Sequence, residues 1–237
     1  MSLISATSHL MNSHKVRLGV GSVKRQRQYS SPLRARQAAT TRRAVLDAAT
    51  ELFIAQGYGA TTIEQIAARA AVSKPTVFTA VGNKQTLLRA IRDVAIAGDD
   101  APIEVAVRPI AARVLAAPDQ RRAVQLIAQA LTDVAGRYAL IEQVIYAAAN
   151  SGEEALRRVC EETEEQKLVG ARKWIDVLSD KGPLRSGLDR STAVDTMWLL
   201  MSSDSYYRLV HGRGWSTAKY ERWLADSIEL LLLPSET

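Results

Sequence analysis

The chain has 237 residues, and a hydrophobic content of 47% is enough for a sizeable core in one large domain or two small ones. A single cysteine, Cys160, excludes disulfide bonds within the chain, and no apolar run approaches the roughly 18 residues that cross a bilayer or forms a signal peptide, so we expect a cytoplasmic protein without membrane partners. The net charge of +6 is uneven, because residues 1–39 carry +7, residues 40–92 carry +4 and residues 93–237 carry −5.

Charge confined to one end is typical of a protein that touches nucleic acid there. Residues 1–39 are basic, Ser-rich and without lasting periodicity, which predicts a mostly disordered N-terminal tail. The tail is either a basic arm that lies along DNA phosphates or enters the minor groove, or a dispensable extension. Met11 could be the true start in place of Met1.

Residues 40–56 are predicted to form the first helix, with Gly57 as the residue that ends it. Arg42 and Arg43 lie in the first turn, where the helix dipole disfavours cations, a cost that vanishes if a DNA phosphate lies there. The apolar residues at helical spacing are Val45, Ala48, Ala49, Leu52 and Phe53.

A second helix is predicted over residues 63–70, and it can begin with either of two capping boxes. One pairs Thr61 with Glu64, and the other pairs Thr62 with Gln65.

After a short turn, a third helix is predicted over residues 74–80, with Ser73 as its N-cap and Pro75 in its first turn, where no amide partner is needed. Two short helices joined by such a turn form a helix-turn-helix, whose second helix enters the major groove of DNA.

Asn83 is predicted to cap a fourth helix that runs to about Ala97. Lys84 follows at its first position, where a cation opposes the helix dipole. Lys84 is either a solvated side chain that tolerates this, or a group that binds one DNA phosphate together with the free amides.

Residues 42–92 resemble the N-terminal domain of the tetracycline-repressor (TetR) family. The matching patterns are V-L-x-A-A-x-x-L-F-x-x-x-G-Y (45–58), T-T-I-x-x-I-A-x-x-A-x-V-S (61–73), P-T-V-F (75–78) and N-K-x-x-L-L (83–88). The resemblance implies an all-α protein, with a helix-turn-helix DNA-binding domain at residues 40–92 and a helical ligand-binding and dimerisation domain at residues 93–237.

The resemblance also implies which residues contact DNA. Those expected at base edges are Lys74, Pro75, Thr76 and Thr79, and those expected at the backbone are Thr62, Phe78 and Lys84. Ser73, Arg42 and Arg43 complete the expected DNA-contacting set.

Three departures from the family pattern stand in this stretch. Ala71 occupies a position where glycine is usual, and it costs about 1 kcal/mol if the site needs a positive φ. Phe78 replaces the usual tyrosine, which removes a hydroxyl that would bond a phosphate, and Ala80-Val81 replaces His-Phe.

The remaining chain reads as further helices, for a total of nine or ten. Residues 103–116 form one with a kink at Pro109, and residues 119–150 form one helix bent near Gly136 or two helices. Three more are predicted over 152–180, from about 190, and over 217–233.

The patterns D-x-x-x-A-x-D-x-x-W (189–198) and G-W-S-x-x-x-Y-E-x-W-L (214–224) resemble C-terminal domains of TetR-family regulators. This implies that the last two helices pair with their twofold mates in a four-helix bundle. The candidate interface residues are Trp198, Trp223, Leu224 and Ile228, and an intrachain core position is the alternative for the two tryptophans.

The expected function is a homodimeric repressor that binds a pseudo-palindromic double-stranded DNA operator and is released from it by a small apolar effector. The alternative is a ligand-independent DNA-binding regulator controlled by its abundance or by a protein partner. No nucleotide-binding or catalytic motif appears, and the three histidines, His9, His14 and His211, suggest no metal site, so we expect neither an enzyme nor a cofactor. The candidate effector-binding residues, each of which is otherwise ordinary core, are Tyr138, Tyr146, Trp174 and Met201.

Overall fold

A computed structural model describes residues 32–98 and 109–235 of the chain. Within these two ranges the fold consists of ten α-helices and one π-helical segment, and it contains no strand. The prediction of an all-α protein with nine or ten helices is confirmed. Residues 1–31, which make up most of the expected tail, lie outside the described residues.

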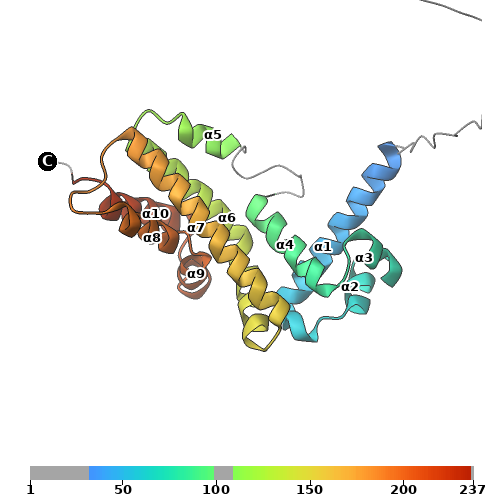
Figure 1. The fold of residues 1–237 in the computed structure, drawn as a ribbon. Coiled ribbons are helices and arrows are strands. Elements are labelled where there is room, and N and C mark those ends of the chain that lie inside the picture. The colour runs from blue at the N-terminus through green and yellow to red at the C-terminus, as the bar shows by residue number, and fades with distance from the viewer. Residues whose placement is uncertain (1–31, 99–108, 236–237) are drawn as a thin grey trace, which may run out of the picture.

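The first four helices form a compact group that we call the head (Figure 1). Its helices are α1 (Pro32–Ala60), α2 (Ile63–Arg69), α3 (Lys74–Ala80) and α4 (Lys84–Ala97).

The other helices form the body, in which α6 and α7 are a long antiparallel pair that runs from the head to α8 and α10 (Figure 1). The elements of the body are α5 (Pro109–Leu115), α6 (Gln120–Asn150), α7 (Glu154–Lys181), α8 (Arg190–Leu200), α9 (Ser203–Tyr206), the π-helix η2 (Tyr207–Gly212) and α10 (Thr217–Leu232).

The first helix begins at Pro32, so the prediction of disorder is wrong for residues 32–39. This segment has no apolar stripe, and its described side chains are exposed. It is nevertheless rich in good helix formers, and proline is favoured at a first helical position. Because α1 is already nucleated by its buried part, each added residue costs little, and the helix extends beyond the core.

The predicted end of this helix at Gly57 is confirmed by the backbone. Gly57 has a φ of 83° and a ψ of 166°, which interrupts the helical geometry within the Pro32–Ala60 span. Glycine reaches this region without the steric cost that a Cβ would add. The chain therefore turns at Gly57 and delivers residues 58–62 to the start of α2.

Two hydrophobic cores hold the molecule together. One lies within the body, between α5, α6, α7, α8 and α10. The other joins the head to the near ends of α6 and α7, so that Phe53, Ile66 and Leu88 of the head share a core with Ile141 and Leu156 of the body. The position of the head is thus set by packing against the same two long helices that form the body.

One of two predictions about the body can be settled within the described residues. Helix α6 is continuous from Gln120 to Asn150, so the alternative of two helices is wrong. Helix α5 is described from Pro109 onward, and the residues that would form the other side of the predicted kink lie outside the described ranges.

No helix in the described part of the chain combines the length and the apolar character that crossing a bilayer requires.

Candidate nucleic-acid interface

Helix α3 presents one exposed surface, which we call the α3 face. Val77 is fully buried and anchors the helix on the head. The side chains left exposed on the helix are Lys74, Pro75, Phe78 and Thr79. Phe78 is a large apolar side chain that is 47% exposed, which is unusual unless a partner covers it.

The start of α3 is fixed by Ser73, as predicted. Its hydroxyl accepts a hydrogen bond from the amide of Thr76 at 3.3 Å, and the two hydroxyls lie 2.7 Å apart. Thr79 donates to the carbonyl of Pro75 at 2.9 Å. Both threonine hydroxyls are therefore held within the helix, and Thr76 is only partly exposed.

The turn before α3 requires a left-handed residue, and Ala71 supplies it. Its φ of 54° is the only positive φ outside glycine in the described ranges. An alanine here is strained by about 1 kcal/mol relative to glycine, because its Cβ approaches the following carbonyl. The position therefore has the positive φ at which alanine is less favourable than the glycine usual in the family.

Lys74, an expected base-contacting residue, forms an ion pair with Glu64 of α2. The hydrogen bond from Lys74 is the main reason why the pKa of Glu64 is lowered from its ordinary value. Both side chains are more than half exposed, so the pair is easily exchanged for another partner. Glu64 was not anticipated as part of this site, because nothing in a ten-residue separation indicates the contact.

Thr62 caps α2 and forms the second of the two possible capping boxes. Its hydroxyl accepts from the amide of Gln65 at 3.2 Å, and the side chain of Gln65 accepts from the amide of Thr62 at 2.8 Å. Thr61 is instead buried and donates to the carbonyl of Gly57 at 2.8 Å. Thr62 is exposed, so its position permits the expected contact to a DNA phosphate.

Lys84 has a role that was not foreseen. Its ammonium donates to the carbonyls of Tyr58 at 2.8 Å and Thr61 at 3.1 Å, and it lies 4.1 Å from the centroid of the Tyr58 ring. The alternative of a solvated lysine is therefore wrong, because the side chain closes the turn between α1 and α2. Contact of Lys84 with a phosphate stays a prediction.

The two arginines of the expected set also make contacts within the head. Arg42 donates to the carbonyl of Ala80 at 3.1 Å, which ties α1 to the end of α3. Arg43 pairs with Asp47 on the exposed side of α1 at 2.9 Å. The extension of α1 adds two further exposed cations, Arg34 and Arg36, at the end that reaches beyond α2 and α3 (Figure 1).

The four candidate effector-binding residues do not form one cluster. Tyr138 is buried in the core shared by head and body, whereas Trp174 and Met201 pack against the core of the body. Tyr146 donates to Glu164 at 2.8 Å. The structure thus brings Tyr138 and Tyr146 to one stretch of α6 and leaves the other two elsewhere.

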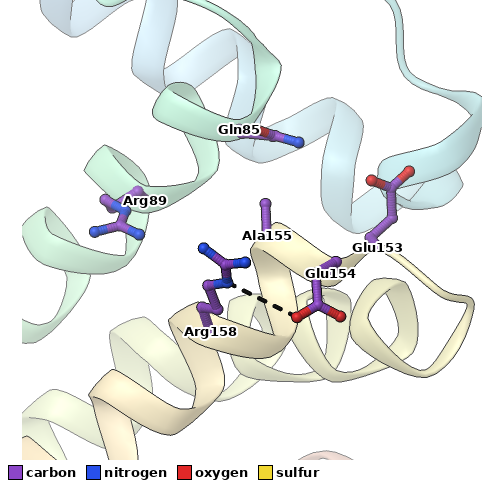
Figure 2. Close-up of a pocket in the computed structure, with 6 residues that line it drawn as sticks. All are labelled: Gln85, Arg89, Glu153, Glu154, Ala155 and Arg158. Atoms are coloured by element: carbon purple, nitrogen blue, oxygen red, sulfur yellow. Dashed lines mark ion pairs between the residues drawn. The ribbon is translucent and has the colours of Figure 1, made fainter.

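One surface hollow of about 490 Å³ lies where α4 meets the start of α7. Figure 2 shows that Gln85 and Arg89 reach it from α4, and that Arg158 and Glu154 line the opposite side from α7. These two side chains form an ion pair with a distance of 3.8 Å. Its lining is largely charged and it opens to solvent, so it does not match an apolar effector.

The prediction of a dimer-interface position is wrong for two of the four candidate residues. Leu224 and Ile228 are 0% exposed within the single chain, because they face α6 and α8 and cannot reach a partner. Trp198 and Trp223 are partly buried against the same core. The large apolar side chains that α8 and α10 leave exposed are instead Leu199, Leu230 and Leu231.

The sequence of the head is similar to those of known regulatory proteins. Residues 45–91 match the model of the family described as bacterial regulatory proteins, tetR family. A 51-residue segment, 22% of the chain, is 45% identical to the uncharacterized HTH-type transcriptional regulator YvkB of Bacillus subtilis (strain 168). The match spans about a quarter of that relative, 27% of its length.

Solved structures extend the likeness of fold to most of the chain. The SmeT–triclosan complex has a TM-score of 0.61 at 19% identity, covering 81% of this chain and 91% of that one. The multidrug binding protein EbrR complexed with imidazole has a TM-score of 0.52 at 19% identity, covering 83% and 92%. At such identities the likeness establishes the fold alone.

Proposed function

The chain belongs to the TetR family of transcriptional regulators, and we propose from that premise that it is a homodimeric repressor whose affinity for DNA is controlled by a small effector. The division into a DNA-binding domain at 40–92 and a ligand-binding and dimerisation domain at 93–237 is part of the proposal. The family consists of regulators, which agrees with the prediction that the chain is not an enzyme.

The observation that carries the DNA-binding part is the α3 face. An exposed phenylalanine, a proline and a lysine held only by an exposed acid stand together on a short helix that Val77 and the Ser73 cap fix in place. Pro75 suits thymine methyl groups and Lys74 suits a hydrogen-bond acceptor in the major groove, while Phe78 is expected beside the DNA backbone. Two copies would lie about 34–36 Å apart on a pseudo-palindromic operator.

Control by an effector is supported by the links between α4 and the body. The buried Arg92 of α4 donates to the hydroxyl of Thr163 on α7 at 3.2 Å, and Arg137 of α6 donates to the carbonyl of Ala95 at 2.9 Å. A shift of α6 or α7 would therefore move α4 and the head with it. An effector that favours the displaced arrangement would release DNA in proportion to its differential affinity for the two states.

The ligands seen with similar folds fit this proposal. One of the solved structures holds triclosan and another holds imidazole, both small molecules. A pocket in this chain would lie among α6, α7 and α8, with Tyr138 and Tyr146 near it.

A second candidate is a regulator without an effector, controlled by its abundance or by a partner. It is favoured by the many fully buried side chains of the body core and by the position of the hollow at α4 and α7, which lies on the surface and is charged.

Genome-wide mapping of bound sites, followed by footprinting with the purified chain, tests the proposal. We expect two protected half-sites about one helical turn apart with twofold symmetry. Protection of a single half-site would contradict the dimer, and no sequence enrichment would contradict the regulator.

A further inference from the structure

A buried group of charged and aromatic side chains lies between α6, α7 and α9, away from the α3 face. Its centre is Glu142 of α6, which is only 4% exposed and whose Oε2 has no hydrogen-bond partner among the residues that the structure describes. A buried carboxylate oxygen without a partner is costly, so such groups are rare and need a reason.

Among the described residues, the charges that act on Glu142 are one cation, Lys167, and two further acids, Glu164 and Asp204. Lys167 binds Glu164 through contacts of 2.8 and 2.9 Å to its two oxygens, and Tyr146 donates to the same carboxylate. The charge of Asp204 on α9 also acts on Glu142, but Asp204 is paired with the exposed Arg208 at 2.6 Å. Within ranges 32–98 and 109–235, an ionised Glu142 therefore has no cation paired with it alone, because Lys167 is bound to Glu164.

Glu142 therefore stays neutral over a wider pH range than an exposed glutamate does. Burial, with smaller contributions from Glu164 and Asp204, raises the pKa of Glu142 to about 7, and Lys167 offsets only part of this. The surrounding aromatic residues share the burial, since the pKa of Tyr138 and that of Tyr220 are both raised, first by burial and then with a contribution from Glu142.

The group already holds a cation in the way that a ligand would be held. The ammonium of Lys167 lies 5.1 Å from the centroid of the Trp198 ring while it contacts Glu164. Aromatic faces and carboxylates together are the surroundings that organic ammonium groups prefer. Lys167 thus balances the charge of Glu164, whereas no cation among the described residues is bound to Glu142.

We propose that Glu142 is the anchor of an effector site for an organic cation with an apolar body, its positive charge paired with the Glu142 carboxylate and its body against Tyr138 and Tyr146. This inference rests on the proposed function and names the chemical class of its effector.

Entry of the cation would require displacement of the wall that packs against α6 beside Glu142. That wall is α9, a single turn of four residues that continues into the π-helix η2, and π-helical segments are frequent at functional sites. Tyr138 lies one turn from Glu142 on α6 and belongs to the core shared with the head. Occupation of the site therefore acts on the helix against which α4 packs.

Binding of a cation requires Glu142 to ionise, so one proton leaves its carboxyl group for the buffer. The test is calorimetric titration of the full chain with benzyltrimethylammonium, which carries a permanent charge and no proton of its own, and with the neutral 2-phenylethanol. Titrations in buffers of different ionisation enthalpy count the protons released.

For the native chain we expect the cation to bind at least roughly tenfold more tightly than the alcohol. Nearly one proton should be released per cation at about pH 6, falling toward none at about pH 8.5. Glu142→Gln should lose this preference and the proton release, yet fold normally, because glutamine copies the neutral acid. The matched control, Glu165→Gln on the exposed side of α7, should behave as the native chain.

Equal cation affinity in the native chain and Glu142→Gln, or no cation binding at millimolar concentration, overturns the inference. A cation that binds through Glu142 but leaves DNA affinity unchanged upholds the site and contradicts control of the proposed repressor by it. DNA release by neutral compounds alone leaves the proposed function standing and overturns the cation site.

Discussion

Ala71 shows how a single backbone angle in the turn of the helix-turn-helix limits stability. Its φ of 54° suits glycine, and alanine is strained there. Ala71→Gly should therefore raise the free energy of unfolding by about 1 kcal/mol, measured by urea denaturation. Ala70 next to it has a φ of −81°, so Ala70→Gly should instead destabilise by roughly 0.5–1 kcal/mol. Destabilisation by both changes would contradict the strain.

Glu142 makes stability depend on pH in a defined direction. Burial raises its pKa to about 7, above the ordinary 4.5, so the folded state binds more protons than the unfolded state between these values. The stability that its neutral form permits is fully present below pH 4.5 and is lost as pH rises through 7.

Glu142→Gln removes this loss, because glutamine cannot ionise. Relative to the native chain it should be more stable by roughly 3 kcal/mol at about pH 8, and by less than about 1 kcal/mol at about pH 5. Urea denaturation of both proteins at the two pH values measures the difference. A gain that does not grow with pH would show that Glu142 ionises freely in the fold.

Among elements, α1 differs most from expectation. Val45, Phe53 and Gly57 carry signals that locate its buried part and its end, and the structure confirms both. Residues 32–39 carry no apolar period, so only propensity and the neighbouring helix extend α1, and periodicity could not reveal it. The extension places Arg34 and Arg36 on an ordered helix.

If this extension lies along DNA, Arg34→Gln with Arg36→Gln should weaken binding to all sequences alike. The slope of log affinity against log salt should flatten by about 2, since each phosphate contact contributes about 0.9. Arg172→Gln with Arg185→Gln removes the same charge from the body and serves as control. Equal slopes in the two double variants would mean that the extension does not touch phosphates.

Helices α8 and α10 leave leucines exposed that suit the proposed dimer interface. Leu199 is 66% exposed and Leu230 is 74% exposed. Leu199→Glu with Leu230→Glu should convert a dimer to a monomer in sedimentation experiments and reduce operator affinity. In the proposed dimer these side chains would be buried, and glutamates from the two copies would repel each other there. Leu115→Glu on α5, also exposed, should leave the dimer intact, and dissociation caused by it alone would point to another interface.

At the scale of the whole molecule, the head was more predictable than the body. Local signals such as the Thr62 capping box and the Ser73 cap locate its helices, and they form as expected. Long-range pairs are invisible in sequence, so the ion pair of Lys74 with Glu64 and the contact of Lys84 with the Tyr58 carbonyl were missed. Periodicity also cannot tell an intrachain core from an interface, which is why Ile228 was misassigned.

The proposed regulator depends on an α3 face that reads the sequence of DNA. Fluorescence anisotropy should compare the native chain and Lys74→Ala on the mapped operator and on a shuffled duplex at the same salt concentration. We expect the operator affinity to fall by roughly 1–3 kcal/mol and the shuffled affinity to fall much less, because only a base contact distinguishes the two duplexes. Equal losses on both duplexes would contradict the claim.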